Sequence, residues 1–208
     1  MVTITEIMVS GNNVCLLLDN GEKVWLKKKD LLVFPVSEGT EWNEDEFRKS
    51  VSLVQYPRAL NHAVAMLARR PCSTGEIRKR LSEKQYMQDV ISLVLYKLEK
   101  ENLVNDRDFC EQWIRYRLDC KYGPRRIIQE LKYKGIPAEM AETMLDAMDH
   151  EDLSDSQAVI LASKYWQKQT CSGDRKKGRQ KIIMQLVRRG YSWDTAKQAT
   201  DMAEKQLG

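Results

Sequence analysis

The sequence lacks any uninterrupted apolar run approaching the roughly 18 residues that a membrane-spanning helix needs. Its opening segment, MVTITEIMVS, also lacks the basic start and apolar core of a secretory signal. We therefore expect no membrane span and a cytoplasmic location. Glycine is scarce, at 10 of 208 residues, and neither a P-loop, a G-x-G-x-x-G fingerprint nor a G-x-S-x-G elbow occurs. These absences argue against nucleotide-dependent enzymes and serine hydrolases.

Residues that carry catalysis or bind metals are equally sparse. The chain has two histidines, His62 and His150, and neither has a serine, cysteine or carboxylate at a known catalytic spacing. We interpret both as ordinary core or surface residues. The cysteines are odd in number and no pair has C-x-x-C spacing: they are Cys15, Cys72, Cys110, Cys120 and Cys171. We therefore predict no catalytic residues, no cofactor, no metal site and no disulfide framework.

Charge is present in abundance, but it is unevenly distributed. Residues 1–56 hold six basic and nine acidic residues, a net charge of −3. Residues 57–208 hold 28 basic and 21 acidic residues, a net charge of +7. The basic surplus of the larger part favours an acidic partner, which is either nucleic acid or an acidic protein surface.

The N-terminal segment has the pattern of β-strands. Two apolar runs within residues 2–27 flank Asp19-Asn20-Gly21, which predicts a hairpin because Asn and Gly tolerate the positive φ of tight turns. Two or three strands cannot bury a core alone. The two following segments, residues 27–36 and 43–56, supply short helical candidates to cover them. We predict a small α+β domain over residues 1–56.

The rest of the chain repeats one pattern three times. Each copy has an isoleucine four residues before a leucine and an apolar residue five after it; the leucines are Leu81, Leu131 and Leu186. The spacings of 50 and 55 residues leave room for three helices per copy. We predict a mainly α protein: three tandem three-helix repeats, at 57–104, 105–151 and 152–208, form an elongated array after the N-terminal domain.

Residues typical of helix ends support the prediction of these helices. Ser73 and Glu76 have the spacing of a capping box, and Pro124 suits a first helical position. After the middle helix, Gly135 and Gly190 suit a left-handed cap, whereas Gln85 at the equivalent place predicts a different one. We expect the last helix of the second repeat to bury a stripe of methionines: Met140, Met144 and Met148. The first helices should begin near Pro57, Asp106 and Ser154.

The middle repeat resembles the signature segment of the RecX family, which comprises bacterial regulators of the RecA recombinase. The matching positions are Val104-Asn105-Asp106, Phe109, Trp113-Ile114, Arg117, Gly123-Pro124, Ile127, Glu130-Leu131 and Lys134-Gly135-Ile136. The resemblance covers residues 57–208, and the β-rich start is similar to the N-terminal extension of some longer members. Pro71-Cys72 and Gln85 depart from the family pattern. Most signature positions have the character of fold-building residues.

The basic residues are the candidate contacts for a partner. The densest run, residues 164–189, holds nine basic residues and one aspartate. Such a run either contacts an acidic partner or is only a solvated surface, and we favour the contact. The candidate partner-binding residues are Arg69, Arg70, Arg125, Arg126, Arg175, Lys176, Lys177, Arg179, Lys181, Arg188 and Arg189.

The family resemblance implies a monomeric regulator without catalytic activity. Members bind the RecA–DNA filament and usually restrain its recombinase, ATPase and coprotease activities, which tunes recombination and the SOS response. An alternative of another class is a direct, sequence-independent module for single- or double-stranded DNA, because tri-helical units can present a helix to a groove. The sequence alone does not decide between inhibition and stimulation of RecA.

Overall fold

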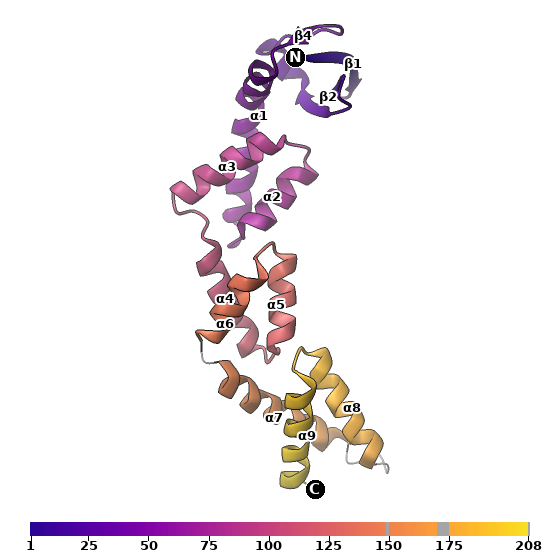
Figure 1. Cartoon of the computed structure of the whole chain (residues 1–208), viewed down its shortest axis with the longest axis vertical. Coiled ribbons are helices and arrows are strands. Elements are labelled where there is room, and N and C mark those ends of the chain that lie inside the picture. Colours follow the sequence, from indigo (N-terminus) through magenta and orange to yellow (C-terminus); the bar gives the residue numbers. More distant parts are fainter. Residues whose placement is uncertain (149, 170–174, 208) are drawn as a thin grey trace. The chain divides into compact units, whose positions relative to one another are not determined.

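The computed structural model describes residues 1–148, 150–169 and 175–207. Figure 1 shows its elements in chain order. The N-terminal ones are β1 (Val2–Ser10), β2 (Asn13–Leu18), β3 (Lys23–Lys27), the 3₁₀ helix η1 (Lys28–Leu32) and β4 (Glu41–Trp42). The helices are α1 (Glu44–Leu67), α2 (Thr74–Glu83), α3 (Gln88–Lys100), α4 (Asp106–Asp119), α5 (Pro124–Tyr133), α6 (Ala138–Asp146), α7 (His150–Gln169), α8 (Arg175–Arg188) and α9 (Trp193–Leu207).

The chain divides into two compact units, Met1–Asn105 and Asp106–Gly208. The first holds the sheet and helices α1 to α3, and the second holds α4 to α9. The predicted fold class, mainly α with three three-helix units after a small strand-containing start, is confirmed.

The N-terminal strands form an antiparallel sheet in the order β3-β2-β1-β4. The predicted hairpin joins β2 to β3, and Gly21 in its turn has a φ of +82°. Val14 and Leu16 of β2 and Val24 of β3 are buried on one face of the sheet, and Cys15 on the other face of β2 is buried as well. One face of the sheet therefore contributes to a core, as the period of two predicts.

Helix α1 corrects the predicted boundary between residues 56 and 57. The helix is continuous from Glu44 to Leu67 and contains Pro57. Its buried positions recur every four residues, at Phe47, Val51, Gln55, Ala59 and Ala63. Pro57 lies on the exposed face, where water can solvate the carbonyl group that loses its helical partner. The buried stripe therefore outweighs the helix-breaking tendency of proline.

Because α1 crosses that boundary, the sheet and the first three-helix unit share one core. The same group of contacting buried residues includes Ile4 and Leu26 from the sheet, Ala63 from α1, and Leu81 and Val94 from α2 and α3. The segment predicted as a separate domain is thus packed as one body with the first repeat.

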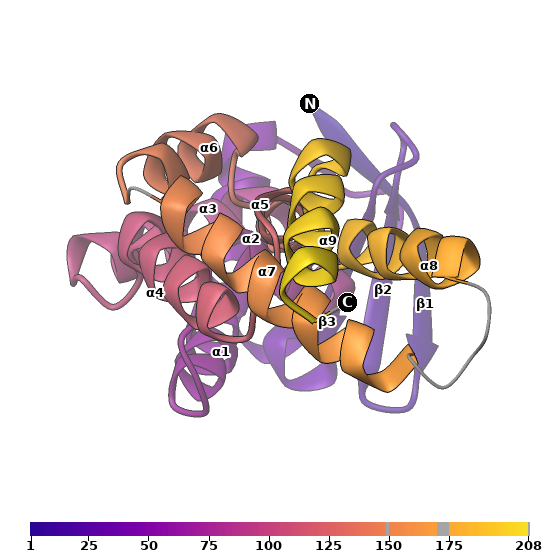
Figure 2. The same ribbon diagram turned by 90° about the horizontal axis from the view of Figure 1, so that it is seen from below.

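The second unit has one core for each of its two repeats. Helices α4, α5 and α6 bury Ile114, Ile127 and Leu131. Helices α7, α8 and α9 bury Leu186 and Tyr191 together with alanines of α7 and α9. Figure 2 shows α9 crossing α7, and α8 packs against both helices.

The turn after each middle helix has the same backbone geometry in all three repeats. The N–H of the apolar residue donates to the carbonyl of the leucine five residues earlier, in the pairs Tyr86–Leu81, Ile136–Leu131 and Tyr191–Leu186. The residue before it has positive φ: Gln85 at 63°, Gly135 at 82° and Gly190 at 97°. This is the Schellman motif. The prediction of a different cap at Gln85 is therefore wrong.

Of the remaining predictions about the helices, some are confirmed and others are wrong. The Ser73–Glu76 capping box and Pro124 at the start of α5 are present. Helix α7 begins at His150, so Ser154 lies inside it. Helix α6 buries Ala141 and Leu145 rather than the predicted stripe of methionines, which is only half-buried. The buried stripe is displaced by one residue from the prediction. Ala141 and Leu145 form a second apolar set at the same four-residue spacing, directly after Met140 and Met144.

Candidate partner-binding surface

Helix α8 carries the centre of the basic run, and its two faces differ. Ile182, Ile183 and Leu186 are buried against the rest of the third repeat. The solvent face presents Lys177, Lys181 and Arg188, at spacings of four and seven residues that place them along one side of a helix. We call these three residues the α8 strip. Met184 lies between them and is 40% exposed.

Two predicted partner-binding residues of α8, Arg175 and Arg179, form ion pairs within the third repeat instead. The Nε of Arg175 lies 2.7 Å from a carboxylate oxygen of Glu204 on α9. Arg179 forms an ion pair with Asp201, and its Nε lies 3.7 Å from Glu204. Partly exposed pairs of this kind contribute about 0–1 kcal/mol each. Their geometry orients α8 on α9, and it turns these two cations away from the α8 strip.

Arg189 has a structural role that the sequence did not indicate. Its Nη1 lies 3.2 Å from the carbonyl oxygen of Cys120 and 3.3 Å from that of Lys121. Its Nε donates to the hydroxyl of Tyr165 at 3.1 Å. Its guanidinium carbon lies 5.2 Å from the ring centre of Tyr122. Arg189 therefore joins the third repeat to the end of α4 in the second.

Backbone contacts continue this junction. The N–H of Gly123 donates to the carbonyl of Arg189 at 2.9 Å, and the N–H of Arg125 donates to that of Gly190 at 3.1 Å. A Cβ on Gly123 would lie 2.4 Å from the backbone of Gly190, and one on Gly190 would lie 2.4 Å from the Cβ of Arg126. The two glycines are needed because the backbones meet directly.

The other predicted arginine pairs each contain one ion-paired member. Arg70 makes two bonds of 3.0 Å to Glu76, and Arg126 approaches Glu130 at 3.1 Å. Their neighbours Arg69 and Arg125 are exposed. Within the described part of the chain, neither Arg69 nor Arg125 has a side-chain ion pair. Lys176 is exposed as well. Of the basic run, residues 170–174 lie outside the described residues.

Signature residues of the second repeat form a stacked group of cations and rings. Lys134 Nζ lies 4.1 Å and the Arg117 guanidinium carbon 4.7 Å from the ring centre of Trp113. Arg117 is also ion-paired with Glu130 at 2.6 Å. Such cation–ring contacts stabilise by about 0.5–2 kcal/mol each. These positions hold α4 on α5, which agrees with their interpretation as fold-building residues.

Burial keeps one thiol and one tyrosine of the second unit, Cys110 and Tyr191, in their neutral forms. Burial raises the pKa of the Cys110 thiol to about 11, which keeps it protonated and unreactive. Burial also raises the pKa of Tyr191 to about 12. Its hydroxyl donates to the carbonyl of Lys121 at 3.1 Å and so adds to the junction between the repeats.

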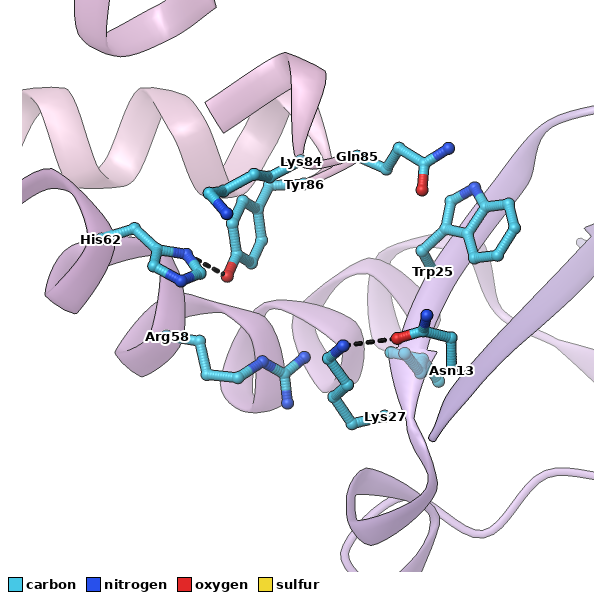
Figure 3. Close-up of a pocket in the computed structure, with 9 residues that line it drawn as sticks. Asn13, Trp25, Lys27, Arg58, His62, Lys84, Gln85 and Tyr86 are labelled. Atoms are coloured by element: carbon cyan, nitrogen blue, oxygen red, sulfur yellow. Dashed lines mark hydrogen bonds between the residues drawn. The ribbon is translucent and has the colours of Figure 1, made fainter. Parts of the chain in front are cut away.

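A pocket in the first unit was missed by the sequence analysis. It lies among β3, α1 and the turn after α2, and Lys27, Arg58, His62 and Lys84 are among the residues that line it (Figure 3). The available signal was the spacing of Arg58 and His62, four residues apart on one helix. Lys27 and Lys84 come from distant segments, and their convergence requires the fold.

The described residues contain neither a metal-type cluster of side chains nor a helix suited to span a membrane. Within residues 1–148, 150–169 and 175–207, no group of three or more His, Cys, Asp or Glu residues has a metal-binding arrangement. In the same part of the chain, no helix has both the length and the apolar character needed to cross a bilayer.

Comparison with protein-family models assigns all three helical repeats. The first, second and third three-helix domains of RecX match residues 59–98, 105–145 and 154–200, respectively. They match in the order of the chain, and each match contains one of the three repeated leucines, Leu81, Leu131 or Leu186.

Individual relatives agree with the domain matches. The regulatory protein RecX of Streptococcus sanguinis is 28% identical over 197 residues, which span 94% of this chain and 75% of the relative. That of Corynebacterium efficiens is 30% identical over 147 residues, or 67% of this chain and 70% of the relative. The crystal structure of RecX from Lactobacillus salivarius is similar in fold, with a TM-score of 0.64 and 24% identity, over 72% of this chain and 97% of that one. The three domain matches and these relatives show that the chain belongs to the RecX family.

Proposed function

We propose that this protein regulates RecA by binding the RecA–DNA filament as a monomer in the cytoplasm. It has no catalytic activity of its own, and it restrains the recombinase, ATPase and coprotease activities of the filament. The observation that carries this proposal is the set of three RecX three-helix domains in one chain. Restraint of these activities limits recombination and the SOS response.

The distribution of exposed cations supports a contact that is spread over the repeats. Arg69, Arg125 and the α8 strip place exposed basic residues on the first, second and third repeats, respectively. Several weak contacts made by one chain add strongly, because each bound repeat raises the effective concentration of the next. The acidic surface that they meet is either filament protein or its DNA phosphates.

The test is RecA-dependent ATP hydrolysis on single-stranded DNA, followed while this protein is titrated in. We expect the hydrolysis rate to fall at or below one molecule of this protein per RecA subunit. Unchanged hydrolysis and strand exchange in the presence of an excess of folded protein would contradict the proposal, and a rise in rate would reverse its sign.

A DNA-binding module that acts without RecA is the competing function. The distinguishing measurement is binding to single- and double-stranded DNA in the absence of RecA, at several salt concentrations. Tight binding with a steep salt dependence would favour the competitor, because phosphate contacts release counterions. Weak binding that RecA strengthens would favour the filament.

A further inference from the structure

The pocket of about 190 Å³ in the first unit carries an inference beyond RecA regulation. Figure 3 shows Lys84 and Tyr86, from the turn after α2, on one side and Arg58 and Lys27 on the other. His62 on α1 lines the end next to Tyr86, and Trp25 on β3 lines the opposite end. Three separate elements therefore bring cations and rings to one concave site.

The charges at this site are not balanced. Lys27, Arg58 and Lys84 line the pocket. The carboxylate of Asp30 on η1 is buried and forms an ion pair with Arg58. The Nε of Arg58 is buried and has no hydrogen-bond partner among the described residues. The two ammonium groups of Lys27 and Lys84 thus remain for an anion, whereas the buried guanidinium of Arg58 adds only its positive charge to the potential at the site.

Uncharged side chains of the pocket add groups that can form hydrogen bonds, and Trp25 adds an aromatic ring. The Tyr86 hydroxyl and His62 Nδ1 lie 2.8 Å apart. The side-chain amide of Asn13 accepts a hydrogen bond from Lys27 Nζ, which holds that ammonium at the pocket. Burial lowers the pKa of His62, and the positive charges of Lys84, Arg58, Lys27 and Arg80 lower it further. This shift agrees with a positive potential that the carboxylate of Asp30 does not cancel.

The walls of the pocket are fixed by a buried amide. Gln55 of α1 donates to the carbonyl of Trp25 at 2.8 Å and accepts from the N–H of Met87 at 3.0 Å. This fully buried side chain ties β3 and the α2–α3 turn to α1. A preformed site loses less conformational entropy on binding than a mobile one.

The turn that closes the pocket also departs from its counterparts. Its left-handed residue is Gln85, whereas the other two repeats have glycine at this position. Gln85 lines the pocket, and its side chain extends toward Trp25 (Figure 3). A non-glycine residue in a left-handed conformation is strained, because its Cβ comes too close to the backbone. The first repeat therefore bears a local cost that places an amide at the pocket rim.

We propose that this pocket binds the phosphate group of a nucleotide, with the attached base against the ring of Trp25. The two lysines meet the phosphate oxygens, and the indole supplies a stacking surface of the kind that binds bases without sequence preference. The site lies in the first unit and is distinct from the α8 strip. It needs no RecA to be occupied, so its failure leaves the proposed regulation of RecA untouched.

The test uses the full chain and calorimetric titration with thymidine 5′-monophosphate. We expect measurable binding of the nucleotide, competition by inorganic phosphate, and no binding of thymidine, which lacks the phosphate. Lys84→Gln should weaken nucleotide binding by about tenfold, the usual value of one charged hydrogen bond. The matched control is Lys100→Gln, which removes the same charge from an exposed site on α3 outside the pocket and should leave binding unchanged.

A second variant separates the base from the phosphate. Trp25→Leu should weaken nucleotide binding by about fivefold or more through lost stacking, and it should leave inorganic phosphate binding unchanged. The hydrogen bond from Gln55 survives this change, because it is accepted by the backbone carbonyl of Trp25. Equal weakening of nucleotide and phosphate binding would show that the base does not stack on Trp25.

A mononucleotide and a nucleic-acid strand are distinguished by the loss that Lys84→Gln causes. A similar loss for thymidine 5′-monophosphate and for a short oligothymidylate assigns the pocket to free nucleotides. A loss several-fold larger for the oligonucleotide assigns it to a strand. In both cases the pKa of His62 should rise when the pocket is saturated with ligand, because a bound anion stabilises the charged imidazolium. Proton NMR reads this pKa, and His62→Gln identifies the signal between the two histidines of the chain.

Three results would overturn the proposal. The first is nucleotide binding that is the same in the parent, Lys84→Gln and Lys100→Gln proteins. The second is no binding of phosphate or nucleotide at millimolar concentration. The third is displacement of the nucleotide by thymidine alone, which would show that the base and not the phosphate is held.

Discussion

The turns at Gln85 and Gly190 have the same backbone but face different surroundings. Both place a residue with positive φ after the middle helix, and both return an N–H to the leucine carbonyl five residues earlier. The side chain of Gln85 is exposed at the rim of a pocket. A side chain at Gly190 would collide with Arg126.

A glycine after the middle helix can be required for two reasons, namely the left-handed backbone of the turn and close packing against another repeat. The sequence does not distinguish these reasons, but the comparison of Gln85 with Gly190 does. The left-handed cap alone tolerates glutamine at a modest cost, as the first repeat shows. The junction with Gly123 tolerates no Cβ, because the contact is between backbones. The repeat pattern therefore specifies a turn, and packing between the repeats then decides which residue may occupy it.

The largest expected effect comes from Gly190→Ala. A Cβ there meets the Cβ of Arg126 at 2.4 Å and its backbone nitrogen at 2.6 Å. Together with the left-handed φ, this overlap should cost about 3 kcal/mol or more of stability. Urea unfolding followed by circular dichroism measures the loss, and hydrogen exchange assigns it to the second unit.

Gly135→Ala is the matched control for that change. Gly135 has the same left-handed conformation and is exposed. Only the conformational cost of about 1–2 kcal/mol should therefore apply. Equal losses at the two positions would show that the junction between the repeats contributes nothing to the demand for glycine.

The next effect concerns the basic residue before each left-handed position. Arg189 donates to two carbonyls of the second repeat, whereas Lys84 at the equivalent position is exposed. Arg189→Gln should cost about 1–3 kcal/mol, because two partly buried carbonyl acceptors lose a charged donor. Lys84→Gln should change stability by less than about 0.5 kcal/mol. Thermal unfolding of both variants measures the difference, and similar melting temperatures would contradict the structural role of Arg189.

A smaller effect of opposite sign is expected for Gln85→Gly. Relief of the left-handed conformation should stabilise the first unit by about 0.5–1 kcal/mol, reduced by the greater freedom of glycine in the unfolded chain. Denaturant unfolding of the parent and the variant gives the difference. A loss of stability would show that the Gln85 side chain makes contacts in solution that offset its strain.

The smallest effect is a dependence of stability on pH through His62. Its pKa is lowered in the folded protein by burial and by Lys84, Arg58 and other cations, so the unfolded chain binds the proton more readily. Stability should therefore be complete above about pH 6.5 and fall as the pH drops toward the folded pKa. His62→Gln should flatten the slope of unfolding free energy between pH 7.5 and 5.5, and an unchanged slope would assign it to other groups.

Local signals in the sequence predicted most of the repeats. The isoleucine and leucine spacing gave the buried residues of each middle helix, and the Ser73–Glu76 box and Pro124 marked two helix starts. The hairpin at Gly21 followed from its turn residues. These features depend on neighbours within a few positions, which are readable from the chain itself.

The errors came from contacts between distant positions. Pro57 continues its helix because packing against the sheet buries the other face of α1. Arg189 was predicted as a partner contact, but its acceptors lie 68 and 69 positions earlier in the chain. The same holds for the pocket, whose lining comes from β3, α1 and the turn after α2. No local pattern specifies which of these segments meet.

The role of the α8 strip is the most direct test of the proposed function. The variant changes Lys177, Lys181 and Arg188 to Gln, and it omits Arg189 because that residue is structural. A control with the same loss of charge changes Lys28, Lys29 and Lys49, which are exposed on the first unit and do not line the pocket. Both variants should melt close to the parent, because none of the six residues is buried.

The measurement is the affinity of parent, strip variant and control for RecA assembled on single-stranded DNA, at low and moderate salt. We predict that the strip variant binds about tenfold or more weakly, a difference of roughly 1.4 kcal/mol, with a flatter salt dependence. The control should bind like the parent. A strip variant that binds like the parent at both salt concentrations would contradict the account and leave Arg69, Arg125 and Lys176 as the remaining candidates.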